Sequence, residues 1–411
     1  MSSNKKFFEH KRPWSRVKDE LLRCYLSPYL NKIITTNNPT LYIDCFAGKG
    51  KFDDGEDGSP ITALNCVRDS IERYKNARLS FHQPTIHVRF IELHFAKELE
   101  NNIPQEYRDH CKVICGKYED EIVQLLNSAI KRYSGRLNVF LYVDPYGIKA
   151  LNAKLFCQLP EVVNTAELLI NLNSVGFIRE ALRVRKITLK ENEAELLSDL
   201  EEFDTSGLNS IQELNNVAGG EYWQSIVDDY KLGRIDFYEA EKRFSAGYKE
   251  MLRTAYKYVL DMPIRIKADK NPKYRMVHAT NHPQGCILMA DNVFRRTDHL
   301  IVDIQRMGQM SLFEQSAEND LVDMSRLEEK TCMYFADLPK KWIKLSDIQA
   351  GFFNEQGVIC SSRHLSSASD SVLKRMEKKG IIEVRRTENG VKKESRAWTE
   401  NRHLAIEIRK K

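Results

Sequence analysis

The stretch LYIDCFAGKGKFDDGEDGSPITAL, residues 41–64, contains an apolar strand, a glycine-rich turn and the start of a helix. The strand ends around Asp44, and four glycines follow it, at positions 48, 50, 55 and 58. Because glycine has no side chain, such a turn can bend close to a bound ligand. In a parallel α/β sheet, ligands bind beyond the carboxyl ends of the strands, so we expect a cofactor site at this turn.

This turn differs from the two common phosphate-binding loops. A Walker A loop is excluded because no Lys-Ser or Lys-Thr follows a glycine at the required spacing, and a dinucleotide fingerprint is met only imperfectly. The string DCFAGKG instead resembles the first motif of class I S-adenosylmethionine-dependent methyltransferases, especially those that act on nucleic acids. That resemblance implies S-adenosylmethionine as the cofactor, held by Asp44, Phe46, Ala47, Gly48 and Gly50.

Four more apolar stretches follow and alternate with longer segments, which is the pattern of a parallel sheet with crossover helices. They are IHVRFIEL (86–93), CKVICG (111–116), VFLYVDP (139–145) and ELLINLN (167–173). All are apolar on both faces, as buried parallel strands are. We therefore expect an α/β fold, which the resemblance of the first motif specifies as a Rossmann-like class I methyltransferase sheet. The expected fold also includes a helical insertion and, from the last eighty residues, a C-terminal winged-helix domain.

Acidic residues after the second and third strands suit the nucleoside part of a cofactor. Glu92 can accept hydrogen bonds from both hydroxyls of a ribose, although a solvated carboxylate is the alternative. Asp120 or Glu119 can bind the exocyclic amine of an adenine ring, although acidic residues also begin helices for the helix dipole alone. We expect Glu92 and Asp120 to complete the cofactor site.

The fourth strand ends in Asp144, Pro145, Tyr146 and Gly147, the predicted catalytic residues. A carboxylate here can accept a hydrogen bond from an amino group and hold its nitrogen toward a methyl donor, while Tyr146 stacks on a flat ring. DPYG resembles the Asp-Pro-Pro-Tyr motif of adenine N6 and cytosine N4 methyltransferases, and more closely the Asp-Pro-Phe-Gly form of transfer-RNA guanine N2 methyltransferases. The target base stays open, and an ordinary Asp-Pro turn is the alternative.

Further candidate substrate contacts lie after the fifth strand and in a later turn. Asn171 and Asn173 lie on the same rim as the catalytic residues, where they bind substrate or simply end the strand. YRMVHAT and GCILMAD, around NHPQG, predict a hairpin whose turn returns to that rim with Asn281 and His282. His278 and His282 share metal-ligand spacing across a strand and turn rather than a helix, so we expect no metal site.

The composition, with 42% hydrophobic and 29% charged residues, is that of an ordinary soluble globular protein. No run of about 18 apolar residues and no apolar signal region is present, which argues against a spanning helix and favours the cytoplasm. Nine scattered cysteines without a C-x-x-C pair indicate reduced thiols rather than disulfides or a structural zinc site. The composition gives no oligomeric state.

The length of 411 residues fits two or three domains. We expect a methyltransferase-like domain over residues 1–300 with a helical insertion at about 177–260, a linker over 301–330, and a winged-helix domain over 331–411. The acidic run KENEAELLSDLEEFD in the insertion is expected to be a solvated helix face. Before the first strand, apolar residues at helical spacing predict a packing helix: Val17, Leu21, Leu22, Tyr25 and Leu26.

The last eighty residues predict two helices and a β-hairpin, with the turn at Asn389 and Gly390. Residues 374–411 hold 13 Lys plus Arg and 6 Asp plus Glu, a net charge of +7 against +5 for the whole chain. A basic winged helix binds DNA phosphates, with protein docking as the alternative. The candidate nucleic-acid contacts are Arg363, Lys374, Arg375, Lys378, Arg385, Arg386, Lys392 and Lys393.

Four strings resemble, in order and spacing, the three-Cys-motif partner proteins, a bacterial family called TcmP, over most of residues 7–300. They are LYIDCFAGKGKFDDGEDGSPITAL, VFLYVDPYGIKAL, ELLINLNSVGFIRE and HATNHPQGCILMAD. The resemblance implies a class I methyltransferase-like fold, a winged-helix tail and a mobile-element or phage-defence setting. It also implies a three-cysteine radical S-adenosylmethionine-like protein as a partner.

Three functions follow from these observations. The first is transfer of a methyl group from S-adenosylmethionine to an exocyclic amino group of a base in DNA or RNA. The second is a non-catalytic or regulatory partner subunit that binds nucleotide or S-adenosylmethionine. The third is a transcriptional regulator whose Rossmann domain senses a metabolite.

Overall fold

The computed structural model describes residues 8–77, 85–190, 193, 208–264, 272, 274–306, 322–393, 396–401 and 403–411. The chain divides into two compact units, Met1–Asn281 and His282–Lys411. The boundary expected near residue 300 is therefore too late. The reason is that the helix beginning at Pro283 belongs to the second unit, where Cys286 contacts the backbone of Ala350.

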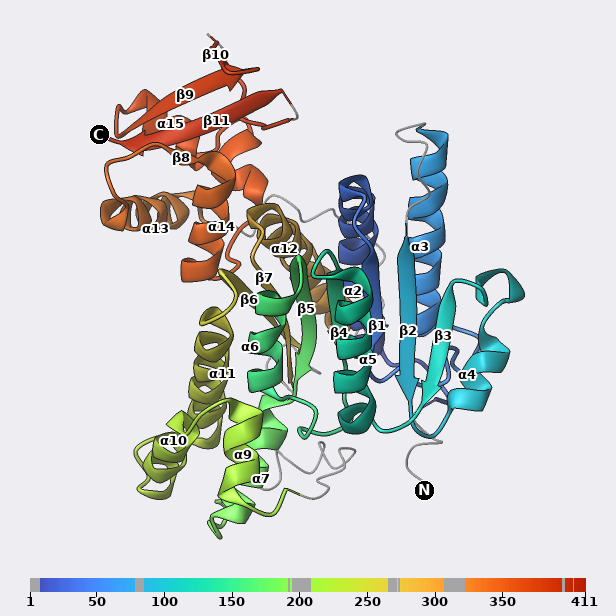
Figure 1. The fold of residues 1–411 in the computed structure, drawn as a ribbon. Coiled ribbons are helices and arrows are strands. Elements are labelled where there is room, and N and C mark those ends of the chain that lie inside the picture. The colour runs from blue at the N-terminus through green and yellow to red at the C-terminus, as the bar shows by residue number, and fades with distance from the viewer. Residues whose placement is uncertain are drawn as a thin grey trace. The chain divides into compact units, whose positions relative to one another are not determined.

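A sheet of seven strands, counted over the described residues, forms the centre of the first unit (Figure 1). The strands are β1 (Thr40–Asp44), β2 (Ile86–Glu92), β3 (Cys111–Cys115), β4 (Asn138–Val143), β5 (Thr165–Leu172), β6 (Tyr258–Ile264) and β7 (Tyr274–Thr280). Their order is β3-β2-β1-β4-β5-β7-β6. Strands β1 to β5 run parallel, and β7 runs antiparallel to both neighbours. The five predicted parallel strands are confirmed, and the sheet is compatible with a Rossmann-like methyltransferase fold.

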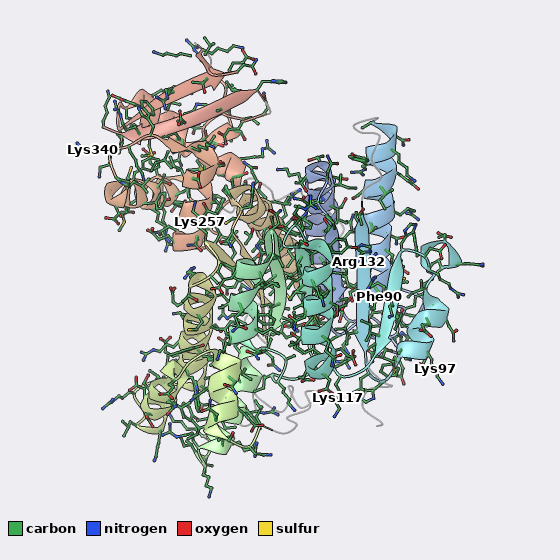
Figure 2. All side chains as sticks on the ribbon, viewed as in Figure 1. Phe90, Lys97, Lys117, Arg132, Lys257 and Lys340 are labelled. Carbon is green, nitrogen blue, oxygen red and sulfur yellow. The ribbon has the colours of Figure 1, made fainter. Side chains whose placement is uncertain are left out.

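The central strands β1 and β4 are buried along their whole length, which explains their apolar sequences. Helices α5 and α6 lie in front of the sheet in Figure 1, while Tyr25 of α2 packs on Phe140 from the other face. Figure 2 labels Phe90, buried in β2, and Lys97 and Lys117, exposed beyond the carboxyl ends of β2 and β3. The helices around these strands are α2 (Pro13–Ile33), α3 (Ser59–Asn76), α4 (Ala96–Asn102), α5 (Tyr118–Tyr133), α6 (Ala153–Val162) and α7 (Ser174–Val184), with short 3-10 turns η1 (Ile34–Thr36) and η2 (Gln105–Tyr107).

The expected helical insertion contains α9 (Ile211–Ala218), α10 (Tyr222–Lys231) and α11 (Phe237–Arg253). Its core is aromatic: Phe177 of α7 stacks on Phe244 with ring centroids 3.8 Å apart, and Trp223 meets Phe177 edge-on. The insertion ends before the expected residue 260, because β6 begins at Tyr258. The acidic run expected to be a solvated helix lies almost wholly outside the described residues.

The hairpin predicted around NHPQG is wrong. Strand β7 does cover YRMVHAT, but its partners are β5 and β6, and residues Pro283–Arg306 form helix α12 instead of a second strand. The most deeply buried apolar residues of that segment are Cys286, Met289, Ala290 and Val293. Their spacing of three and four has the period of a helix, and Pro283 suits a helix start.

The second unit combines helices with a four-stranded antiparallel sheet of order β10-β9-β11-β8. After α12 come α13 (Met324–Asp337), β8 (Ile343–Lys344), α14 (Leu345–Gln356), a π-helical turn η3 (Arg363–Ser367), α15 (Val372–Lys378), β9 (Ile382–Glu388), β10 (Val391–Lys392) and β11 (Leu404–Lys410). The expected turn at Asn389 and Gly390 joins β9 to β10, with φ positive at both residues. Both ends of the linker expected over 301–330 are helical, because α12 reaches Arg306 and α13 starts at Met324. Residues 307–321 of that segment lie outside the described residues.

Candidate functional site at the carboxyl edge of the sheet

The candidate site lies where the strand order changes direction. The chain passes from β1 to β2 and β3 on one side, and from β4 to β5 on the other. Adjacent parallel strands separate there beyond their carboxyl ends and leave a crevice for a ligand. Asp44 is the last residue of β1 and pairs in register with Tyr142, two residues before Asp144. The two predicted carboxylates therefore lie on neighbouring strands at one edge.

Asp44 is a buried carboxylate with no cation beside it. Its side chain is 0% exposed and accepts hydrogen bonds from Ser59 Oγ at 2.6 Å and from the Phe46 N–H at 3.2 Å. Among the described residues it forms no ion pair. The pKa of Asp44 is raised to about 7, mainly by burial and in smaller part by the charges of Asp144 and Asp19, while the hydrogen bonds from Ser59 and Phe46 lower it. Near neutral pH this group is therefore poised to ionise when a cation arrives.

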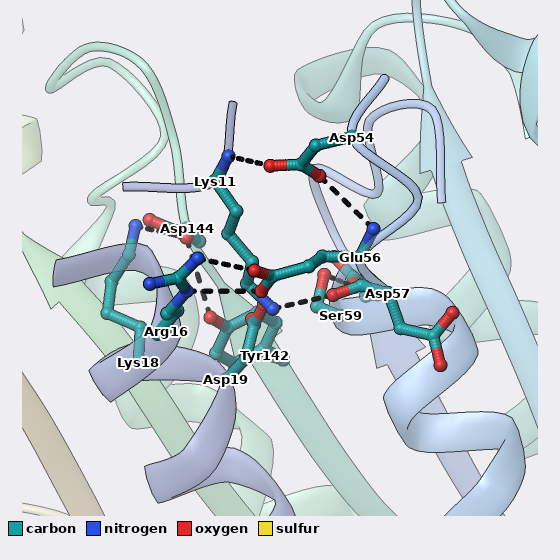
Figure 3. Close-up of polar contacts among 11 residues, drawn as sticks. Lys11, Arg16, Lys18, Asp19, Asp54, Glu56, Asp57, Ser59, Tyr142 and Asp144 are labelled. Atoms are coloured by element: carbon teal, nitrogen blue, oxygen red, sulfur yellow. Dashed lines mark hydrogen bonds and ion pairs between the residues drawn. The ribbon is translucent and has the colours of Figure 1, made fainter. Parts of the chain in front are cut away.

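Asp144 is held from two sides, as Figure 3 shows in part. Lys18 Nζ lies 2.6 Å from Asp144 Oδ2, and Asn171 Nδ2 donates to Oδ1 at 2.7 Å. The Tyr142 hydroxyl is 3.4 Å from Oδ2. The carboxylate orientation is thus fixed by a cation and an amide.

Sequence analysis missed Lys18, although a signal was present. Lys18 lies three and four residues before Leu21 and Leu22 and seven before Tyr25, so it shares the apolar face of the predicted packing helix. The structure buries it, with 8% exposure. A lysine on a buried helix face requires an anionic partner. The identity of that partner depends on the sheet topology and could not be predicted from spacing.

A third carboxylate, Asp19, belongs to the same cluster. Lys11 Nζ pairs with Asp19 at 2.7 Å, and its ammonium also donates to the Asp57 carbonyl at 2.6 Å. Burial nevertheless raises the pKa of Asp19 to about 6, while Lys11 and Lys18 lower it and Asp144 raises it. Three carboxylates are thus accompanied by two ammonium groups, which leaves the negative charge of Asp44 uncompensated.

The glycines of the turn give the backbone a shape that other residues would disturb. Gly48 and Gly50 have φ values of +64° and +79°, which L side chains rarely adopt. A Cβ at Gly50 would lie 2.7 Å from Leu99. Gly58 approaches closely too, donating its N–H to the Gly50 carbonyl at 2.8 Å. The spacing of the glycines therefore reflects a tightly closed loop.

Glu92 lies at the expected edge, but its partners are backbone groups. One oxygen accepts the N–H of Gly48 at 2.7 Å, and the other accepts those of His94 and Phe95 at 2.8 and 3.1 Å. The carboxylate therefore fastens the glycine turn to the loop after β2. This role differs from the expected hydrogen bonds to a ribose.

The N-terminal segment covers the glycine turn, which sequence analysis did not foresee. The Phe8 ring contacts Phe52 and Phe95, and a Cβ at Gly48 would meet it at 3.0 Å. The acidic part of the turn is bound as well. The Lys11 N–H donates to Asp54 at 2.9 Å, the Asp53 N–H donates to the Phe8 carbonyl at 2.8 Å, and Arg16 pairs with Glu56.

The remaining predicted residues of the two motifs lie near this edge in different environments. Pro145 is buried, while Tyr146 and Gly147 are half-buried. Burial raises the pKa of Tyr146, and the nearby carboxylates Glu92 and Asp144 raise it further. Asp120 is exposed in the first turn of α5. Tyr118, which sequence analysis did not select, packs on Phe46 with ring centroids 5.1 Å apart.

Of the candidate substrate residues, only Asn171 joins the cluster. It is 3% exposed, and its Oδ1 accepts no hydrogen bond from the described residues. Asn173 instead caps α7, accepting the Gly176 N–H at 2.8 Å.

Asn281 was expected at the same rim, and this prediction is wrong. Thr280 pairs with Glu167 near the start of β5, because β7 runs antiparallel to β5. Asn281 therefore follows β7 at the opposite edge, where it binds the backbone of Ala255 and Lys257. His282 is the next residue and begins the second unit, with Nδ1 accepting the Gln284 N–H at 3.2 Å. The turn that was to carry both residues to the site does not exist.

Over the described residues, no group of three His, Cys, Asp or Glu side chains could hold a metal ion. His278 instead contacts Glu167 through Nε2 at 3.0 Å. In the same part of the chain, no helix combines the length and the apolar character that crossing a membrane requires.

The basic residues of the second unit fall into two groups. Five of the eight candidates contact other groups within the unit: Lys374 with the Ser367 and Ala368 carbonyls, Arg375 with Asp370 and Glu328, Arg385 with Glu407, Arg386 with Glu377, and Lys393 with Glu388. Arg386 is only 8% exposed and lies over the Trp398 ring, so it is a structural residue. Arg363, Lys378 and Lys392 are exposed.

Comparisons with known proteins add little to this geometry. No family model matches the chain, and no curated protein matches its sequence. Eleven chains of solved structures match. One is a loganic acid methyltransferase with SAH, which is 10% identical to this chain; the match covers 68% of this chain and 82% of that chain, with a TM-score of 0.26. A likeness this weak carries no argument about function.

Proposed function

We propose that the first unit binds S-adenosylmethionine at the carboxyl ends of β1 and β4 and transfers its methyl group to an exocyclic amino group of a nucleic-acid base. The observation that carries this proposal is Asp44, a fully buried carboxylate without a cation, beside a closed glycine turn and next to Asp144. A buried uncompensated charge is unfavourable unless a partner is supplied. A cationic ligand is that partner.

The residues present fit this cofactor. S-adenosylmethionine carries an ammonium and a sulfonium group, so its charge complements the excess of carboxylates. Asp44 would bind a cationic group, Gly48 and Gly50 would shape the turn beside it, and Phe46 with Tyr118 offers an aromatic surface beside the turn. Glu92 would act through the shape of the turn, and Asp120 remains a proposed contact for the adenine amine.

The chain's own residues would hold the acceptor amine. The cofactor supplies an activated methyl group on sulfur, so transfer depends on placing a nitrogen in line rather than on a strong base. Asp144 would accept a hydrogen bond from the amino group, with Asn171 Oδ1 as a second acceptor beside it. Tyr146 would stack on the base, with Pro145 and Gly147 shaping its backbone.

The second unit is proposed to be a winged helix that binds the nucleic-acid backbone. Support comes from its succession of helices and the β9–β10 hairpin, together with the exposed cations Arg363, Lys378 and Lys392. Such cations bind phosphates rather than bases, so they would supply affinity without selecting a sequence.

A second candidate function is a non-catalytic partner subunit that binds nucleotide or S-adenosylmethionine. The observation in its favour is that Lys18 already occupies Asp144 Oδ2. A three-Cys-motif protein as partner, a phage-defence or mobile-element setting and a cytoplasmic location would suit both candidates. They are implied by resemblance and composition.

Calorimetric titration with S-adenosylmethionine, and separately with S-adenosylhomocysteine, tests the cofactor proposal. We expect saturable binding by the wild type, loss in Asp44→Asn, and unchanged binding in Asp53→Asn, a matched control whose exposed carboxylate in the same loop pairs with Lys49. Well-folded protein that binds neither compound would overturn the proposal.

Transfer of a labelled methyl group to DNA and RNA then separates the two candidates. Asp144→Ala should abolish transfer in an enzyme while cofactor binding survives. Binding of the cofactor without transfer to any nucleic acid by the wild type would favour the partner subunit.

A further inference from the structure

Lys18 is part of a rigid element. It lies in α2, a helix of 21 residues whose side chains Leu21, Leu22 and Tyr25 are fully buried. Such packing fixes the helix, and a long side chain anchored at a buried Cα has few alternative places to go. The contact of Lys18 with Asp144 is therefore a built feature of the first unit rather than a surface ion pair.

The groups around Lys18 Nζ stabilise its positive charge and fix its position. Besides Asp144 Oδ2 at 2.6 Å, its Nζ lies 5.3 Å from the centre of the Tyr274 ring. The face of an aromatic ring attracts a cation, more strongly where water is excluded. Tyr274 is buried, and its hydroxyl has no hydrogen-bond partner among the described residues.

The contacts of Lys18 and Asn171 with Asp144 leave part of its capacity to accept hydrogen bonds unused. Lys18 and Asn171 each bind one of the two carboxylate oxygens, although an ionised carboxylate can accept about four hydrogen bonds. Asn171 Oδ1, on the amide whose nitrogen binds Asp144, is buried and accepts nothing from the described residues. A ligand group that satisfies both must bring N–H donors, as a primary amino group does.

This arrangement requires Asp144 to be ionised. The titratable groups near it are Lys18 and Asp19 of α2, Asp44 of β1, Tyr142 of β4, Tyr146 after β4 and Tyr274 of β7. Lys11, before α2, pairs with Asp19. Without Lys18, Asp144 would lie near two other carboxylates and lose the ammonium that it contacts. Repulsion between like charges would then act on Asp144, and its Oδ2 would lose the contact that directs it.

We propose that Lys18 is a positioning residue of the amine site, which keeps Asp144 charged and oriented so that Asp144 and Asn171 Oδ1 together select a primary amino group. This inference rests on the proposed function and adds a residue to its machinery. Lys18 acts through Asp144 and takes no part in the transfer itself.

Nucleoside pairs that differ at one amino group test the proposal. Adenosine with purine riboside, cytidine with uridine, and guanosine with inosine would be titrated by NMR against the full chain saturated with S-adenosylhomocysteine. We expect the wild type to prefer the amino member of at least one pair by about tenfold at pH 7, since a buried acceptor is then satisfied.

Variants separate the role of Lys18 from a general loss of structure. Lys18→Met should lose the preference at pH 7, whereas Lys18→Arg, which keeps a cation beside Asp144, should retain it. Lys242→Met, which removes an exposed helical lysine paired with Glu239 of α11, is the matched control and should behave as the wild type. Asn171→Leu should also lose the preference, because it removes the second acceptor.

Two results would overturn the inference. One is a preference in Lys18→Met equal to that of the wild type at pH 7. The other is a wild type that discriminates in no pair, or that binds none of the nucleosides. Binding of S-adenosylhomocysteine is recorded in the same samples and reports on the cofactor proposal separately. If Lys18→Met does not fold, Lys18→Gln, which also removes the cation beside Asp144, decides by the same nucleoside preferences.

Discussion

The first unit holds two buried clusters around carboxylates, one at each edge of the same sheet, and they differ in how completely they are satisfied. At the amino edge, Glu167 accepts from the Tyr25 hydroxyl at 2.5 Å and Thr280 Oγ1 at 2.7 Å and contacts His278 Nε2 at 3.0 Å. Within the described residues, one polar atom of that cluster, His278 Nδ1, has no partner. At the carboxyl edge, the described residues give Asp44 no cation and Asn171 Oδ1 no donor.

This difference distinguishes a structural cluster from a site. Glu167 joins α2, β5 and β7 through side chains of the chain itself, so its hydrogen bonds stabilise the fold. The carboxyl edge keeps buried polar groups that need partners from outside. Burial alone does not identify a functional carboxylate. A functional carboxylate is identified by a buried group nearby that still lacks a cation or a hydrogen-bond donor.

The largest expected effect is on stability at the amino edge. Glu167→Ala removes the common acceptor of three buried groups and should lower the free energy of unfolding by about 3 to 5 kcal/mol. Denaturant unfolding measures it, with Glu161→Ala, an exposed glutamate of α6, as the control. A loss below about 1 kcal/mol would mean that the Glu167 cluster does not stabilise the fold, and the proposed difference between the two edges would fail.

Asp44→Asn should change stability in the opposite direction. The folded-state pKa of Asp44, about 7, lies above its usual value of 3.8, so ionisation costs stability increasingly as pH rises between these values and fully above pH 7. The variant should therefore be more stable than the wild type at pH 8, by at most about 4 kcal/mol. At pH 4 the gain should vanish. Destabilisation at pH 8 would contradict an uncompensated charge.

The affinity for S-adenosylmethionine should depend on pH through Asp44 at the carboxyl edge and not through Glu167 at the amino edge. A cationic ligand binds the ionised form of Asp44 better, so affinity should rise from pH 6 to pH 8 by at most about tenfold per unit, with proton release. Calorimetry in buffers of different ionisation enthalpy measures the affinity and the number of protons released. Glu167→Gln should retain the profile. A flat profile in the wild type would exclude Asp44 as the group that meets the cation.

The smallest effect extends the comparison to the second unit. Replacing the exposed cations Arg363, Lys378 and Lys392 with glutamine should weaken binding to a labelled duplex and lower the salt slope by about 3. The same change at Arg375, Arg385 and Lys393, which pair with acids, should leave the slope nearly unchanged. If the two triple variants had equal salt slopes, an ion pair within the unit would not determine whether a cation can bind the duplex.

The sequence predicted the parallel strands well because their signal is local. Runs such as VFLYV are apolar on both faces, and Asp44 and Asp144 follow such runs directly. That β1 and β4 are neighbours is a property of the strand order, which local patterns do not contain. The juxtaposition of the two carboxylates became visible only in the structure.

The errors have a related cause. NHPQG contains turn-forming residues, but Pro283 begins a helix there. The edge strand β6 was not predicted, and the helical insertion was expected to run to about residue 260. Contacts between residues far apart in the sequence could not be predicted either. Lys18 meets Asp144 across 126 positions, and Glu92 meets Gly48 across 44. A residue type and its spacing predict that a partner is needed, not which partner the fold supplies.

The N-terminal cover of the glycine turn has a consequence for the entropy of binding. Phe8 and Lys11 already hold the turn through Asp53 and Asp54, and ordering a free loop costs about 1 to 2 kcal/mol per residue. A ligand therefore meets a surface ordered in advance, and little conformational entropy should be lost when it binds. A chain shortened to begin after Arg12 would keep every residue of the turn and still bind more weakly.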